Sequence, residues 1–221
     1  MNKIKAAIIY YSSTGANHQL AQWAMEGAEK AGAEVRLRKV KELAPESAIQ
    51  SNAAWKKHYD QTKNDEEATL SDLEWADVII FSCPTRYGNV PAQLKQFMDS
   101  TGGLWSQGKL ANKVVTAMAS AMNPHGGQEA TILSLYTTMY HWGAIVVTPG
   151  YTNAILFKTG GNPYGTSVSV DDKGRMKEDV KEAAVYQAMR AVTVAMWLKL
   201  GSTNGGESVD EKEISNQMSH V

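Results

Sequence analysis

The chain has 221 residues, of which 43% are hydrophobic and 20% are charged, as is ordinary for one globular domain. Its 22 Lys and Arg residues nearly balance its 23 Asp and Glu residues, which argues against nucleic acid or a membrane surface as a partner. A single cysteine, Cys83, excludes an intrachain disulfide. The sequence contains no run of about 18 apolar residues, the length that would favour insertion into a membrane. The lack of a disulfide suits a reducing compartment, so we expect a cytoplasmic protein. The five histidines show no metal-ligand spacing, so we expect no metal site.

Five short apolar runs predict strands that are covered on both faces, as in a parallel sheet. They lie at residues 4–11, 33–40, 78–83, 114–119 and 144–147, and the second is expected nearer an edge. Amphipathic stretches lie between and after them, at about 20–28, 93–100, 128–140 and 180–198. Strands that alternate with helices predict an α/β fold, namely a doubly wound five-stranded parallel sheet with helices on both faces.

Three segments depart from this alternation. Residues 41–71 are polar and mixed in charge, and we expect a surface insertion with a helix at 52–62. Residues 151–177 are rich in Gly, Asn, Ser and Thr and predict a long loop of the kind that is often functional. Residues 201–221 predict a flexible tail after a single domain at 1–200.

The loop after the first strand is suited to a phosphate group. Ligands of open α/β sheets bind beyond the carboxyl ends of the strands, and free amides at a helix start attract anions. Neither the lysine of a P-loop nor the GxGxxG spacing is present, which favours a phosphate monoester held by neutral donors. A plain helix cap is the structural alternative. The candidate residues are Ser12, Ser13, Thr14, Gly15, Ala16 and Asn17.

Two further loops follow the third and fourth strands. Prolines and a glycine in the first of them predict a rigid turn whose amides face a ligand, and Tyr87 could stack on a planar ring. Small residues in the second allow a ligand to approach the backbone closely. For both loops a purely structural turn is an equal alternative. The candidates are Pro84, Thr85, Arg86, Tyr87, Gly88 and Asn89, and then Ser120, Ala121, Met122, Asn123, His125 and Gly126.

In these loops the sequence resembles the WrbA-type NAD(P)H:quinone oxidoreductases, a branch of the flavodoxin-like superfamily. The resemblance extends over roughly residues 3–200. The matching stretches are 10–12 with Gly15, 84–89, 101–105, 126–129 and 160–165, in the order in which the family has them.

The resemblance implies a flavodoxin-like fold, FMN as cofactor, NADH or NADPH as electron donor, a quinone as acceptor, and a homotetramer. It implies that the first loop holds the FMN phosphate, that residues 85–88 line the isoalloxazine, and that residues 120–126 contact the ribityl chain. His141 falls where the family has a histidine that faces the flavin from a neighbouring subunit. Trp105 falls where it has an aromatic wall of the substrate pocket. From the residues alone, a core histidine is the favoured interpretation of His141, and the resemblance reverses it.

The sequence also departs from this family. Thr14 stands where an aromatic residue often contacts the nicotinamide cofactor, and residues 41–71 match poorly. The working hypothesis is two-electron, ping-pong reduction of quinones at one face of the flavin. The alternatives are a flavodoxin-like one-electron carrier and a non-catalytic FMN-binding regulatory partner. Cys83, at a strand end before a proline, is expected to be a buried small side chain rather than a redox thiol.

Overall fold

All the strands of the structure join one parallel sheet. The computed structural model describes residues 3–203, so residues 204–221 of the expected tail lie outside it. The order across the sheet is β2-β1-β3-β4-β5, with β6 also paired to β4. The bounds are β1 Lys5–Tyr10, β2 Glu34–Lys39, β3 Val78–Pro84, β4 Val114–Ala121, β5 Ile145–Val146 and β6 Ser167–Ser169.

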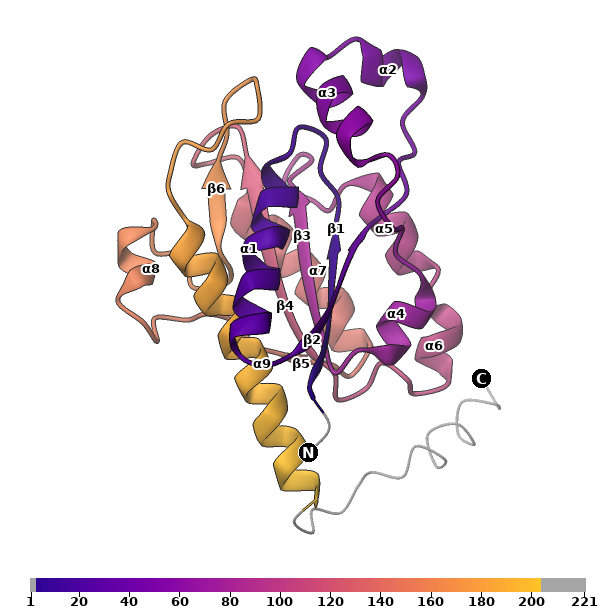
Figure 1. Ribbon diagram of the computed structural model, residues 1–221, viewed down its shortest axis with the longest axis vertical. Helices are drawn as coiled ribbons and strands as arrows, with labels where there is room; N and C mark the ends of the chain where they lie inside the picture. Colours follow the sequence, from indigo (N-terminus) through magenta and orange to yellow (C-terminus); the bar gives the residue numbers. More distant parts are fainter. Residues whose placement is uncertain (1–2, 204–221) are drawn as a thin grey trace.

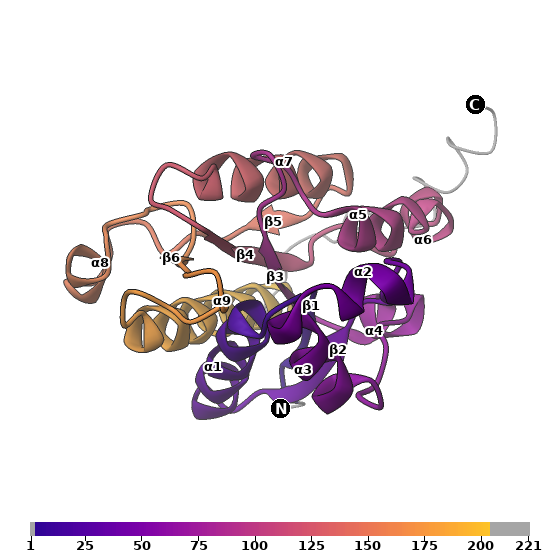
Figure 2. The same cartoon turned by 90° about the horizontal axis from the view of Figure 1, so that it is seen from above.

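Helices cover both faces of this sheet, and the fold class expected from the sequence is confirmed (Figure 2). Alternation along β1 shows the reason, because Ala6 and Ile8 enter one core cluster while Ala7 and Ile9 enter the other. The helices on one face are α1 (Ala16–Lys30) and α9 (Lys181–Thr203); those on the other are α4 (Leu70–Trp75), α5 (Ala92–Asp99), α6 (Gly102–Ser106) and α7 (Gln128–His141). No helix among residues 3–203 has the length and hydropathy that a bilayer span needs.

The fifth strand position is filled in two pieces. β5 pairs with the start of β4 at Val114 and Val115, and β6 pairs with its end at Ala119–Ala121. The chain leaves the sheet between them and forms α8 (Ile155–Lys158) before it returns. The long loop expected at 151–177 therefore contains a short helix and a strand, whereas α9 includes the first three residues of the expected tail.

The insertion after β2 lies above the carboxyl ends of β1 and β2 (Figure 1). It contains α2 (Glu46–Gln50) and α3 (Ala53–Thr62), and α3 agrees closely with the helix predicted at 52–62. On its return the chain pairs with the end of β2, where the amide of Ala68 donates to the carbonyl of Lys39 at 2.7 Å. The exposed edge of the sheet is thus partly covered by the insertion.

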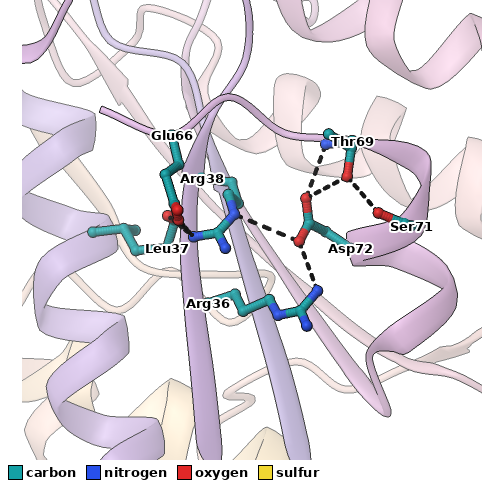
Figure 3. Close-up of polar contacts among 7 residues, drawn as sticks. All are labelled: Arg36, Leu37, Arg38, Glu66, Thr69, Ser71 and Asp72. Atoms are coloured by element: carbon teal, nitrogen blue, oxygen red, sulfur yellow. Dashed lines mark hydrogen bonds and ion pairs between the residues drawn. The ribbon is translucent and has the colours of Figure 1, made fainter. Parts of the chain in front are cut away.

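A buried carboxylate, Asp72, fixes the returning chain to β2 (Figure 3). It accepts hydrogen bonds from the amide and hydroxyl of Thr69 at 2.9 and 2.7 Å, and Arg36 lies 3.1 Å away. Arg38 bridges Asp72 at 3.5 Å and Glu66 at 2.5 Å. Burial raises the pKa of Asp72, but the bonds from Thr69 and the two arginines outweigh burial and hold that pKa below its ordinary value.

Replacement of Asp72 by alanine removes the side chain that caps α4 together with Thr69 and takes the carboxylate from Arg36, whereas Arg38 keeps Glu66. We expect the free energy of unfolding to fall by about 2–3 kcal/mol in urea denaturation. Asp60→Ala, which removes an exposed carboxylate paired with Lys56, should leave it nearly unchanged because solvent screens this pair. Because folding lowers the pKa of Asp72, its contribution is complete above the ordinary carboxyl pKa and is lost as the pH falls. A difference between wild type and Asp72→Ala that stayed constant down to about pH 3 would contradict this role.

Candidate functional site

Three loops meet at the carboxyl ends of β1, β3 and β4, which are neighbours in the sheet. A guanidinium nitrogen of Arg86, in the second loop, lies 3.3 Å from the hydroxyl of Ser13 in the first. A Cβ added at Gly127 would lie 2.7 Å from the Cα of Gly88, so the second and third loops touch through their backbones. The structure therefore brings together the three loops that the sequence marks as candidates.

The first loop presents free backbone donors. Gly15 caps α1 with a positive φ of 103°, and its amide donates to the hydroxyl of Ser12 at 3.0 Å. No side chain caps this helix, and no described residue accepts a hydrogen bond from the amides of Ser13, Thr14 or Ala16. Such a set of amides at a helix start, where the helix dipole is positive, is suited to an anion.

The side chain of Asn17 forms hydrogen bonds within the protein. It is 2% exposed, and its amide nitrogen donates to the hydroxyl of Ser120 at 2.6 Å. The hydroxyl of Ser82 donates to the backbone carbonyl of Asn17 at 2.9 Å. Of the residues proposed for the first loop, Asn17 thus has its side chain engaged within the protein, and its backbone amide is the group left for a ligand.

The second loop is a tight two-residue turn. The amides and carbonyls of Arg86 and Asn89 exchange hydrogen bonds at 2.9 and 3.0 Å, and Tyr87 and Gly88 both have positive φ. Thr85 accepts a hydrogen bond from the amide of Gly88 at 3.0 Å, which stiffens the turn. The ring of Tyr87 is fully exposed, so it is available to a planar ligand or to another chain.

The third loop begins at the buried Ser120 and Ala121 and continues into exposed residues. Met122 is 65% exposed, and the side chain of Asn123 accepts a hydrogen bond from the amide of His125 at 3.0 Å. Gly126 packs against Ala121, because a Cβ there would lie 2.4 Å from the methyl group of Ala121. The loop is therefore compact, and its outer face is open.

A fourth segment, the turn after β6, also contacts the first loop. A Cβ added at Gly174 would lie 2.3 Å from the hydroxyl oxygen of Thr14, so the turn after β6 packs directly on this loop. The side chain of Asp171 shapes the turn by accepting hydrogen bonds from the amides of Lys173 and Arg175. The sequence Asp171-Asp172-Lys173-Gly174 is typical of a turn, but nothing in it indicates the contact with Thr14.

The structure does not bring His141 and Trp105 to these loops within one chain. Gln128 starts α7 beside the third loop, and His141 ends it about 20 Å further along the helix axis. The indole nitrogen of Trp105 donates to the carbonyl of His141 at 2.8 Å, so both residues lie at this distant end. They sit near the start of β4, because Asn112 bonds to Gly143 there.

Cys83 is fully buried at the end of β3, and burial raises its pKa to about 12, with a small opposing effect of Arg86. A thiol with so high a pKa is a poor nucleophile, in keeping with a packing role. Within residues 3–203, no group of three or more His, Cys, Asp and Glu side chains could hold a metal ion.

Comparison with known proteins identifies the family. The model of the NADPH-dependent FMN reductase family matches residues 4–156. The chain belongs to this family. It is 51% identical over 189 residues to a protein named NAD(P)H dehydrogenase (quinone) from Deinococcus radiodurans, covering 86% of this chain and 94% of that one. A protein of the same name from Geotalea daltonii is 38% identical over 199 residues, covering 87% and 97% of the two chains.

Solved structures agree on the fold. A flavodoxin, WrbA-like protein from Agrobacterium tumefaciens superposes with a TM-score of 0.63 at 21% identity, covering 88% of this chain and 99% of that one. An archaeal flavodoxin gives 0.56 at 16% identity, with coverage of 87% and 99%. The sequence resemblance to WrbA-type flavodoxin-like oxidoreductases is thereby confirmed.

The contact between the second and third loops yields a prediction. In Gly127→Ala the new methyl group would meet the backbone of Gly88, and φ is +93° at this position. We expect a loss of about 1–3 kcal/mol in the free energy of unfolding. Gly103→Ala, in helix α6 with open space around it, should be neutral or stabilise by up to about 1 kcal/mol. Equal effects of the two variants in thermal melts would refute the close contact.

Proposed function

We propose that the chain is an FMN-dependent oxidoreductase that reduces quinones at the expense of NADH or NADPH. The family supports this, as do relatives named NAD(P)H dehydrogenase (quinone) that the chain matches over most of their length. The observation that carries the proposal is the set of free amides at the start of α1, next to a rigid turn with an exposed aromatic ring. We further propose that the enzyme acts in the cytoplasm.

Each loop has its own proposed contact with FMN. The amides of Ser13, Thr14, Ala16 and Asn17 and the hydroxyls of Ser12, Ser13 and Thr14 would hold the phosphate, and Gly15 would shape the loop around it. The turn at 85–88 would hold the isoalloxazine through its amides and the Tyr87 ring, with Arg86 and Asn89 fixing the turn. Residues 120–126 would contact the ribityl chain. The absence of a lysine from the first loop fits a monoester bound by neutral donors and a helix dipole.

When bound, FMN supplies the ability to take a hydride from a reduced nicotinamide and to pass two electrons to a quinone. The protein's part is to hold the ring edge with amides, which favour the negative charge that develops on reduction. The proposed order is ping-pong, with donor and acceptor using the same open face in turn. No residue is assigned as an obligatory acid or base, although His141 could donate a proton to the reduced acceptor.

We also propose that the site is completed by a second copy of the chain within a homotetramer. His141 and Trp105 lie about one helix length from the loops of their own chain, so they can serve a flavin only if a neighbour presents them. In that arrangement the indole of Trp105 would wall the quinone slot and the imidazole of His141 would face the ring. Both residues belong to the substrate side of the site rather than to the phosphate side.

The main alternative is a one-electron carrier of the flavodoxin kind. The near-neutral charge of the chain counts against it, because a carrier that docks on basic partners is expected to be acidic. A non-catalytic regulatory partner of a DNA-binding protein is the second alternative, and it would need no reaction with NADH. Both alternatives predict a chain that NADH alone does not reduce.

Anaerobic reduction separates these functions. Purified protein saturated with FMN should lose its flavin absorbance near 450 nm within seconds of NADH or NADPH addition, at about 10 per second, a typical enzymatic rate. Addition of a benzoquinone should restore the absorbance without a semiquinone signal. Bleaching that needs a separate reductase would favour the carrier, and a chain that stays colourless with FMN would exclude both redox functions.

Contribution of His141 from a neighbouring chain can be tested by mixing two inactive variants. His141→Ala disables one half of the site, and Gly15→Val disables the other, since a side chain at φ +103° distorts the first loop. Co-assembled chains that carry one variant each should recover about a quarter of wild-type quinone reduction, because one site in four then combines intact halves. If His141 acts within its own chain, the mixture stays as inactive as its components.

A further inference from the structure

Helix α3 of the insertion places a histidine beside the first loop. His58 is 8% exposed, and its Nδ1 lies 3.6 Å from the point where a Cβ on Gly15 would be. Its ring lies 5.4 Å from the ring of His18 on α1, centroid to centroid. In the described part of the chain nothing forms a hydrogen bond with this imidazole.

The residue is almost covered, yet its imidazole has no hydrogen-bond partner among the described residues, so an acceptor placed beside it would add a bond that the chain itself does not supply. His58 lies against Gly15, and the residues on either side of Gly15 in the first loop carry amides without an acceptor, namely those of Ser13, Thr14 and Ala16. An anion placed at the start of α1 would accept from these amides and from an imidazole N–H together. One ligand at this loop would therefore accept hydrogen bonds both from the helix start and from the insertion.

We propose that His58 is an additional ligand of the FMN phosphate, supplied by the insertion and donating a hydrogen bond from its imidazole to the anion at the start of α1. This inference rests on the proposed function, since it assumes that FMN occupies the first loop. It gives residues 41–71 a role that the sequence leaves open. The first loop would then be held between α3 on one side and the turn at Gly174 on the other.

The cavity beside His58 carries charges of both signs. It has a volume of about 160 Å³, and Ser12 is the residue of the first loop that lines it. Its charged groups are three lysines, Lys39, Lys41 and Lys63, and two carboxylates, Glu42 and Glu67. The charge of Glu42 is already shared among donors, because its oxygens accept from Tyr11, Trp55 and Gln93.

The titratable groups that act on His58 come from several elements. Burial, followed by His18 on α1, lowers the pKa of His58 to about 4; Lys39 on β2 also lowers it, and Asp65 after α3 opposes them. Tyr10 and Tyr11 of the first strand region and Tyr59 of α3 complete the lining. At neutral pH the ring is therefore uncharged and still offers one N–H. A bound phosphate would raise its pKa, so the contact strengthens as the pH falls toward the value in the complex.

FMN and riboflavin, which differ only by the phosphate, provide the test. The flavin fluorescence of each is titrated with wild type, His58→Phe, His58→Gln and Gln61→Ala. His58→Phe keeps an aromatic ring against His18 but has no donor, and His58→Gln keeps a donor. Gln61 is exposed on α3 and serves as the control.

His58→Phe should weaken FMN binding about ten-fold or more, as expected for loss of one hydrogen bond to a charged group, and leave the riboflavin affinity unchanged. His58→Gln should recover part of the loss, and Gln61→Ala should match wild type. Equal changes for both flavins, or no change for either, would overturn the role of His58 while leaving FMN binding intact. Failure of wild type to bind FMN at all would instead overturn the proposed function.

A measurement on the unmodified protein makes the test independent of variant folding. The imidazole resonances of His58 are followed by NMR against pH in the free chain, with FMN, with riboflavin and with inorganic phosphate. Its pKa should rise with FMN and with excess inorganic phosphate, and should stay near that of the free chain with riboflavin. A pKa that does not respond to either phosphate compound would refute the contact.

Discussion

The position of helix α1 depends on a buried amide side chain. Asn17 joins the first turn of this helix to Ser82 on β3 and Ser120 on β4, where polar groups would otherwise be buried without partners. These bonds hold the start of the helix against the carboxyl ends of two strands. Ser120 is bonded to the side chain of Asn17 and Ser82 to its backbone carbonyl, while the amides of Ser13, Thr14 and Ala16 have no acceptor among the described residues. The proposed anion site thus lies where the helix is attached to the sheet.

A buried amide side chain likewise holds β6, the second piece of the fifth strand position, in place. Gln187 of α9 is almost fully buried, and its amide nitrogen donates to Thr116 at 2.7 Å and to the carbonyl of Ala117 at 2.9 Å. Its oxygen accepts from the amide of Thr166 at 2.6 Å, just before β6 begins. At Gly165 the backbone comes so close to β4 that a Cβ would lie 2.0 Å from the carbonyl of Ala117. The chain that leaves the sheet through α8 is therefore fixed again just before β6. From there it continues to the turn at Gly174, which contacts the first loop.

Much of this architecture is encoded in local patterns. Continuous apolar runs mark the strands because both faces of the sheet are covered, and the insertion helix at 53–62 follows from its own periodicity and its Asn52 cap. The three-residue strand β6 carries no such pattern, since only its pairing with β4 defines it. The loop residues at the strand ends could be predicted as a site. Which of their polar atoms remain available to a ligand could not be predicted.

Asn17 and His58 illustrate that limit in opposite directions. In the sequence Asn17 belongs to a phosphate loop, yet its side chain is used inside the protein. His58 belongs to a poorly matching polar insertion, yet it lies against that loop. Both facts depend on contacts between residues 43 or more positions apart in the chain, namely His58 with Gly15 and Asn17 with Ser120, and no periodicity in the sequence indicates them.

Helix α7 runs from the loops that would hold FMN to the end that carries His141. Its outer surface is relevant to how these two parts come together from different chains. Between the loop end at Gln128 and the distant His141, the side chains of Leu133 and Tyr140 are 43% and 64% exposed, seven positions apart and thus on one face. Two chains related by a twofold axis across this face would run antiparallel, and each would present its His141 end to the loops of the other. Such a pairing covers apolar surface and completes two sites at once. Leu133 and Tyr140 thus offer apolar surface between the two halves of the site, which the homotetramer proposed above would cover in this arrangement.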